Sequence, residues 1–144
     1  MKILVATDGS KDSMEAGEFV GKMVKEDPGL EIHLITVMDP SVGLMVVEPE
    51  EAAVLPHLNE ALASDAQRAL DATEKFLADA GVTVASRSSK WGDPASVICH
   101  TADEEGMDMV VVGSRGMGEI SGLVLGSVSS RIVHRCSKPV LVVR

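Results

Sequence analysis

Aromatic side chains are almost missing from this sequence, whose 144 residues include one Trp, two Phe and no Tyr. A core built from this chain must therefore consist of Val, Leu, Ile, Ala and Met side chains. The scarcity argues against binding of single-stranded nucleic acid, which relies on stacking of bases on aromatic rings. The length fits one domain over residues 1–144, and a domain of this size can bury a core without a disulfide or a metal.

Positive charge is also in short supply, because 13 Lys and Arg face 22 Asp and Glu and leave a net charge of −9. An acidic surface repels both the phosphate backbone and anionic lipid, so we expect neither nucleic acid nor a membrane as a partner. A small phosphorylated ligand stays compatible with this charge where local donors outweigh the overall field.

Cysteine is limited to Cys99 and Cys136, which form no CxxC pair. This usage predicts reduced thiols in a cytoplasmic protein, with neither a disulfide nor a metal site. The four histidines are scattered without an HExxH pattern, which makes a histidine metal site unexpected as well. The apolar run at the N-terminus turns polar at Thr7, which is too soon for a signal peptide or a membrane span.

Apolar runs and amphipathic segments alternate along the whole chain. We expect strands at 2–7, 31–38, 82–88, 107–112 and 139–143, and helices at 12–26, 58–80, 94–105 and 127–136. Such alternation predicts an α/β fold, namely a single-domain, Rossmann-like three-layer sandwich with a parallel sheet between helices. The irregular segment 39–57 contains the apolar patch 43–47, which is a lid, a partner surface or a packed loop.

Two segments carry unusual chemistry where a strand ends. Thr7-Asp8-Gly9-Ser10 follows the first strand, and GSRGMGEISGLVLGSVSS, residues 113–130, follows the fourth. Ligands of parallel sheets bind beyond the carboxyl ends of the strands, where the strand order reverses. If the first and fourth strands are neighbours, both segments line one crevice.

The second segment has the spacing Gly113-x2-Gly116-x9-Gly126-Ser127. It is neither a Walker loop, since Gly-Lys-Ser/Thr is missing, nor a clean GxGxxG turn. Gly126 and Ser127 begin a helix, whose free amides and dipole favour an anion, and the segment's one cation, Arg115, can pair with phosphate. The alternative is a flexible loop and a serine-capped helix that need no ligand.

Asp8 permits two interpretations. Asp before Gly is a good turn and N-cap residue, but a carboxylate at a strand end can also accept ribose hydroxyls or help to hold Mg²⁺ through water. The stretch DGSKDS, residues 8–13, is similar to the SGGxDS loop of ATP pyrophosphatases, although Asp8 would repel pyrophosphate there. Trp91 is interpreted as a partly packed residue of the KWGDP turn, not as a platform for adenine.

Besides the glycine spacing, three stretches match a family pattern: KILVATDGS, GDPASVICHTADEEGMDMVVVGSRG and SKPVLVVR. Together they resemble the ATP-binding subgroup of the universal stress protein family over the whole chain. The resemblance implies a five-stranded parallel sheet of order 3-2-1-4-5. It implies that the first turn holds adenine and ribose, that the backbone of Val37 reads the adenine edge, and that the glycine segment holds ribose and phosphates. It assigns no contacts to 117–125. The expected nucleotide-binding set is Ala6, Thr7, Asp8, Val37, Gly113, Arg115, Gly116, Gly126, Ser127, Val128 and Ser129.

The same resemblance implies an ATP-binding module of stress response or signalling, with Mg²⁺ and with slow or no hydrolysis. ADP, AMP and a cyclic nucleotide remain open as ligands. The apolar strand 139–143 implies a homodimer, since an open sheet edge needs a partner. One alternative is an enzyme, either an ATPase, an adenylating enzyme, or an autokinase that uses Ser127, Ser129 or Ser130. Another is a nucleotide-free interaction module.

Overall fold

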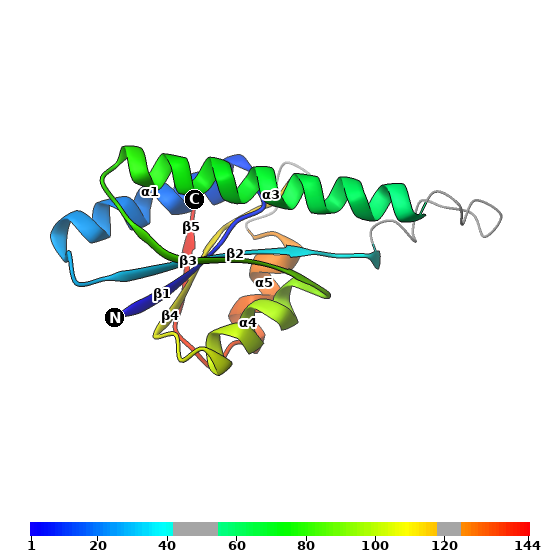
Figure 1. Cartoon of the computed structure of the whole chain (residues 1–144). Coiled ribbons are helices and arrows are strands. Elements are labelled where there is room, and N and C mark those ends of the chain that lie inside the picture. The colour runs from blue at the N-terminus through cyan, green and yellow to red at the C-terminus, as the bar shows by residue number, and fades with distance from the viewer. Residues whose placement is uncertain (42–54, 118–124) are drawn as a thin grey trace.

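The computed structural model of the chain describes residues 1–41, 55–117 and 125–144. Strands and helices alternate along it (Figure 1). In chain order they are β1 (Lys2–Ala6), α1 (Lys11–Glu26), β2 (Glu31–Met38), α3 (Leu55–Asp79), β3 (Val84–Trp91), α4 (Pro94–Glu104), β4 (Met109–Gly113), α5 (Ser127–Arg135) and β5 (Val140–Val143).

The strands form one parallel five-stranded sheet with the order β3-β2-β1-β4-β5. The expected α/β class and strand order are therefore confirmed. The central strand β1 pairs with β4 from Ile3 opposite Met109 to Ala6 opposite Val112. The two segments that follow β1 and β4 consequently lie side by side. From the sequence alone, this adjacency was only a condition for a shared crevice.

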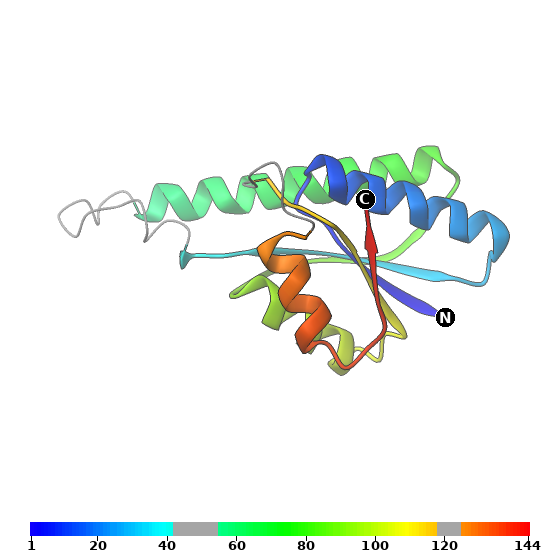
Figure 2. The ribbon, with the colours of Figure 1, turned by 180° about the vertical axis from the view of Figure 1, so that it is seen from behind.

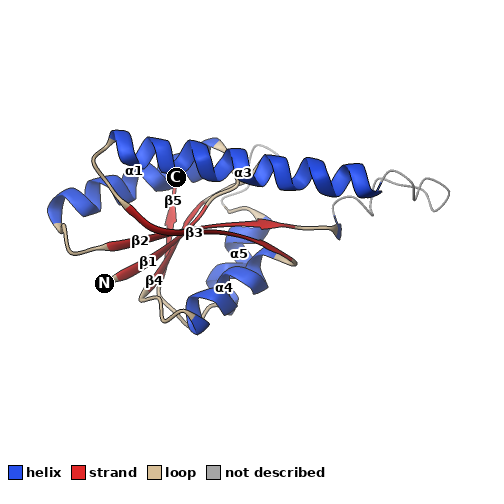
Figure 3. Cartoon of the chain, viewed as in Figure 1, coloured by secondary structure: helices blue, strands red, loops and turns tan. Residues whose placement is uncertain are grey.

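Helices cover both faces of the sheet (Figure 3), and each face carries its own core. Side chains alternate along β1, so that Val5 packs with Val20 of α1 and Leu77 of α3, while Leu4 packs on the opposite face with Ile98 and Ile132. Helices α1 and α3 cover one face and α4 and α5 the other, which gives three layers built from aliphatic side chains.

The helix ends follow from local sequence. Ser10 is the N-cap of α1, where its hydroxyl oxygen accepts a bond of 3.3 Å from the amide of Ser13. Asp93 caps α4 in the same way, and Pro94 occupies the first turn, where its missing N–H costs nothing. Helix α3 stops before Gly81, which has a φ of 83° that favours glycine.

One expected boundary is wrong in a way that affects interpretation. Strand β3 continues to Trp91, which lies opposite Met38 of β2, so Trp91 is a strand residue and not part of a loop. Pairing with the eight-residue β2 extends β3 beyond its apolar portion, because ladder bonds do not require apolar side chains. The apolar patch 43–47 lies outside the described residues.

The prediction of reduced thiols is wrong. Cys99 of α4 and Cys136, which follows α5, form a disulfide with a Cα–Cα distance of 4.9 Å. The two residues are 37 positions apart, and only the packing of α4 against α5 brings them together. Sequence spacing without a CxxC motif holds no signal for such a pair.

Candidate functional site

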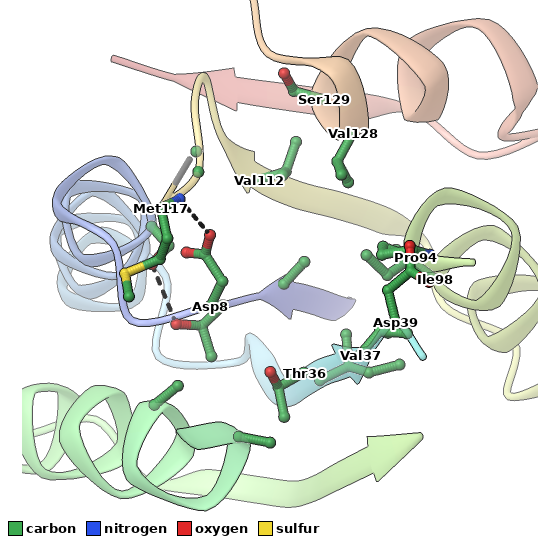
Figure 4. A pocket seen from close by; sticks show the side chains of 18 of the residues that line it. Asp8, Thr36, Val37, Asp39, Pro94, Ile98, Val112, Met117, Val128 and Ser129 are labelled. Carbon is green, nitrogen blue, oxygen red and sulfur yellow. Dashed lines mark hydrogen bonds between the residues drawn. The ribbon is translucent and has the colours of Figure 1, made fainter. Parts of the chain in front are cut away.

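A cavity of about 500 Å³ opens at the carboxyl ends of β1 and β4 (Figure 4). Its volume is within the range of small-molecule sites. Every residue of the expected nucleotide-binding set lines it except Gly126, which lies just before the lining residue Ser127. Tertiary structure thus brings together β1, β2, the glycine segment and the start of α5 around one cavity.

Gly113 ends β4 at the point where α1 passes closest to the sheet. A Cβ at this position would lie 2.5 Å from the carbonyl carbon of Asp12 and 2.7 Å from the amide nitrogen of Ser13, both backbone atoms. No side chain fits such a space. The first glycine of the motif therefore serves the close packing of α1 on β4, whatever ligand the cavity holds.

Ser114, which the sequence analysis did not single out, organises the glycine segment. Its amide donates to the carbonyl of Val143, and its carbonyl accepts from both the amide of Gly126 and the hydroxyl of Ser129, each over 2.7 Å. Its hydroxyl donates to Asp12 Oδ2 over 2.7 Å. These bonds fasten the end of β4 to β5, to α1 and to the start of α5. A serine beside a motif glycine gives no distinctive sequence signal.

Asp12 is a buried carboxylate on the first turn of α1. The hydrogen bond from the Ser114 hydroxyl lowers its pKa, burial opposes this effect, and the guanidinium of Arg115 reinforces it. Arg115 Nε lies 3.1 Å from Asp12 Oδ2. The cation assigned by sequence to a phosphate is thus already paired with a carboxylate, while 44% of its side chain stays exposed to the cavity mouth.

Asp8 connects the two segments directly. Its Oδ1 accepts a bond of 3.0 Å from the amide of Ser10, and its Oδ2 accepts one of 3.2 Å from the amide of Met117 (Figure 4). A Cβ on Gly116 would lie 2.7 Å from the same Oδ2. The carboxylate needs the second glycine of the motif in order to approach. Met117, to which the sequence assigned no contact, lines the cavity beside it.

The side chain of Thr7 has structural partners within the fold. Its hydroxyl lies 2.9 Å from the hydroxyl of Thr73 on α3 and 3.3 Å from that of Ser13 on α1. Both Thr7 and Thr73 are buried. The side chain therefore joins the three elements from within and leaves the backbone of Thr7 at the cavity wall.

Helix α5 begins at the cavity. Gly126 is its N-cap, and its first turn contributes Ser127, Val128 and Ser129 to the lining. The Ser129 hydroxyl is buried and donates to the carbonyls of Ser114 and Gly126 over 2.7 and 3.1 Å. The first turn of a helix presents backbone amides and the positive end of its dipole, which together attract an anion.

The opposite part of the cavity is largely apolar. Val37 and Ile98 lie on one side of it in Figure 4, and Val112 and Val128 lie across from them. The missed residues of this part include Ile35, Pro94, Ile98 and Val112, together with the face of α3 formed by Leu62, Ala66 and Ala69. Their sequence signal is that of ordinary core side chains, so only the fold distinguishes them.

The lining is more acidic than basic. Asp8, Asp39 and Asp65 contribute carboxylates, whereas Arg115 and Arg131 contribute the cations. Arg131 is paired with Asp93, the N-cap of α4. Burial raises the pKa of Asp93, but the bonds from Ser96 and Arg131 outweigh burial and lower it overall. Within residues 1–41, 55–117 and 125–144, no group of three or more His, Cys, Asp or Glu side chains is arranged to hold a metal.

None of the helices in the described parts of the chain has the length and apolarity that a membrane crossing requires.

Comparison with known proteins is consistent along the full length. The model of the universal stress protein family matches residues 1–144. Universal stress protein MJ0531 of Methanocaldococcus jannaschii is 33% identical over 99% of this chain and 81% of its own length. The solved structure of MJ0577 from the same organism superposes with a TM-score of 0.80 at 31% identity, covering 99% of this chain and 94% of that one.

A universal stress protein solved in complex with cAMP is also similar to this chain, with a TM-score of 0.66 and 25% identity over 100% of this chain and 96% of that one. The family model, the sequence similarity and the fold similarity each extend over almost the whole chain. The chain belongs to the universal stress protein family.

Proposed function

We propose that this protein binds an adenine nucleotide, ATP together with Mg²⁺, in the cavity at the ends of β1 and β4, and acts as a nucleotide-dependent stress-response or signalling module. The observation that carries the proposal is the cavity of about 500 Å³ between the glycine segment, the start of α5 and an apolar slot. A related protein solved with cAMP supports an adenine nucleotide as the ligand class.

The apolar part suits the base. Val37, Ile98 and Val128 come from β2, α4 and α5 and can enclose a planar ring between aliphatic side chains. Thr36 and Val37 lie near the end of β2, beyond Ile35, where the pairing of this strand with β1 ends, and in this proposal their backbone groups on that side read the polar edge of the base. Binding of this kind needs no aromatic platform, which the composition does not offer.

The polar part suits ribose and phosphates. Asp8 supplies acceptor oxygens for hydroxyl groups, and the start of α5 supplies helical amides for an anion. Gly113 and Ser129, in this proposal, act by shaping the loop, since the first packs on α1 and the second bonds to loop carbonyls. Arg115 reaches the mouth and neutralises part of the phosphate charge.

Mg²⁺ follows from the balance of charge. A polyphosphate that enters a lining with three carboxylates and two arginines, both already paired, adds negative charge to an acidic surface. A divalent cation carried by the nucleotide offsets that charge. Asp8 would act on the cation through water, since its oxygens accept two backbone bonds.

We propose slow or no hydrolysis. The cavity lining among the described residues contains neither a lysine nor a histidine, and each of its carboxylates is already engaged. Asp8 accepts from the amides of Ser10 and Met117, Asp39 accepts from Ser41, and Asp65 is paired with Arg68. A rapid hydrolase needs a group free to take a proton from water. Steady phosphate release well above the buffer rate would favour the enzyme alternative. We assign the module to the cytoplasm, where free ATP is available.

The first experiment is titration of the purified protein with MgATP by calorimetry, using Ser127→Asp and Ser127→Asn. Aspartate at the first position of α5 complements the helix dipole, so the fold is preserved, but its charge repels phosphate. We expect the wild type and Ser127→Asn to bind at micromolar concentration and Ser127→Asp to lose at least about tenfold in affinity. Absence of heat with the wild type, or equal affinity for all three, would refute the assignment.

We also propose a homodimer through β5. This strand lies at the sheet edge (Figure 2), and all four of its residues are half-buried. The carbonyls of Pro139 and Val143 accept bonds from β4, so by the two-residue period the backbone groups of Val140 and Val142 point to the open side.

The dimer is tested by Val142→Pro, which removes a donor on the open side only, with Val142→Ala as the control that keeps it. Light scattering should give a dimer mass for the wild type and the alanine variant and a monomer mass for the proline variant. A monomeric wild type at micromolar concentration would contradict the proposal.

A further inference from the structure

The disulfide between Cys99 and Cys136 joins two helices that form one wall of the cavity. Cys99 lies in the middle of α4, next to Ile98, whose side chain lines the cavity. Cys136 is the C-cap of α5, and its amide donates to the carbonyl of Ile132 over 2.9 Å. The cross-link therefore connects the apolar slot on α4 with the far end of the helix whose first turn faces the proposed phosphates.

The other connections between these helices are weaker. Asp93 accepts bonds from Arg131 and Arg135, and Ser96 accepts one from Arg135. The side chains of Arg131, Arg135 and Asp93 are 39%, 51% and 35% exposed, so water screens these ion pairs. Partly exposed pairs contribute little to stability. Ile132 adds apolar contact in the same layer. The disulfide thus adds a covalent constraint on where α5 lies relative to α4 to this apolar packing.

The core is large enough for the chain to fold without the disulfide. A chain of 144 residues with both sheet faces covered can bury enough apolar surface without a cross-link. Disulfides in proteins of reducing compartments are usually transient or redox-sensing. A pair that is not needed for folding and that constrains a ligand cavity has the arrangement expected of such a site.

The two sulfur atoms differ in access. Cys99 is 8% exposed and lies within the core of the α4–α5 layer, while Cys136 is half-buried at the end of its helix. A thiolate from solution would attack Cys136 Sγ, and Cys99 would leave as the thiolate. Attack in the opposite order requires opening of the core.

We propose that Cys99–Cys136 is a redox site acted on by a dithiol reductant, and that its reduction weakens nucleotide binding by releasing α5 from α4. In the first step the reductant thiolate bonds to Cys136 Sγ and the bond to Cys99 breaks. The second thiol of the reductant then closes a disulfide within the reductant and frees Cys136. Two electrons and two protons pass to the protein, which ends with two thiols.

The state of the disulfide affects the cavity through the conformational order of α5. With the disulfide closed, the first turn of α5 and the slot beside Ile98 are held in one arrangement before the nucleotide arrives. With the disulfide open, α5 samples more positions, and binding has to order it again. Affinity falls by that cost, which we expect to be at least about fivefold, at the lower end of typical couplings between sites. This inference rests on the proposed nucleotide binding.

The experiment uses the full chain in two states, treated with oxidised glutathione or with dithiothreitol and then freed of reagent under argon. Alkylation and intact mass count the thiols, which should be none and two. Calorimetry with MgATP measures the dissociation constant of each state, and hydrogen exchange follows the amides of 130–136. The variant Cys99→Ser/Cys136→Ser, given both treatments, controls for effects of the reagents.

We expect reduction to raise the dissociation constant at least about fivefold and to speed exchange in α5, with the double variant resembling the reduced protein under both treatments. Equal dissociation constants in the two states, unchanged exchange, or two thiols that persist after oxidation would each overturn the redox site. Failure of the proposed function looks different, because neither state would then bind nucleotide, and that result would also remove the coupling.

Discussion

Substitution of Gly113 by alanine tests whether the first glycine of the motif serves the fold. The new Cβ would lie 2.5 Å from the Asp12 carbonyl carbon, whereas ordinary contact begins at 3.4 Å, so α1 or β4 has to retreat by about 0.9 Å. The obstacle is backbone at a helix start, which cannot rotate away. The Asp12 bonds to Ser114 and Arg115 would be distorted by the same shift.

Two opposing effects determine the expected change in the free energy of unfolding. Overpacking against backbone costs up to about 3 kcal/mol, and the lower entropy of an unfolded alanine offsets roughly 0.5 kcal/mol. The net loss is therefore up to about 2.5 kcal/mol, for which the melting temperature falls by roughly 5–10 °C in a chain of this size.

The assay is urea unfolding followed by circular dichroism, with Gly21→Ala as the matched control. Gly21 lies inside α1, where a Cβ would meet the side chain of Ala80 at an ordinary 3.7 Å. The same chemical change should therefore stabilise the protein there, by roughly 0.5–1 kcal/mol. A Gly113→Ala protein within about 0.5 kcal/mol of the wild type would refute the packing argument.

Three further changes address the residues around the cavity. Gly116→Ala should displace the Asp8 carboxylate and weaken nucleotide binding about tenfold with little loss of stability, since a side chain and not backbone has to move; unaltered calorimetry would contradict this. Asp12→Asn should destabilise the protein at neutral pH. Because folding lowers the Asp12 pKa from 3.8, its contribution is present above that value and disappears as acid protonates it, so the difference from wild type should shrink from about pH 5 to about pH 2 in urea titrations. Thr73→Val should cost about 1–3 kcal/mol by leaving the buried Thr7 hydroxyl without this partner, while Thr73→Ser, which keeps the hydroxyl, should cost clearly less.

The proposed nucleotide binding, dimerisation and redox change would all involve α5 and the chain that follows it. The start of α5 faces the cavity, its end carries Cys136, and the chain continues directly into β5 at the sheet edge. A change in the position of α5 can therefore reach both the ligand and the proposed dimer surface. If these proposals hold, this connection would give the protein a physical means to transmit ligand and redox state to the dimer surface.

Much of the fold could be predicted because its signals are local. The alternation of apolar strands and amphipathic helices sets the α/β class, and β2 runs over Glu31–Met38 as expected, since its apolar run has clear ends. The end of β3 was misjudged because Lys90 and Trp91 are held by pairing with β2, which is a non-local cause. The Cys99–Cys136 pair was missed for the same reason.

For the site, sequence alone identified the turn after β1, the glycine segment and the start of α5, since an Asp-Gly turn, glycine spacing and a helix start are encoded in consecutive residues. Only tertiary structure decided what each residue does there. Gly113 is required by α1, Gly116 by Asp8, and the Ser129 hydroxyl by loop carbonyls, while Ser114 connects them. The physical reason is that backbone conformation is encoded locally, whereas close approach and hydrogen-bond partners depend on elements that only folding brings within a few ångströms of one another.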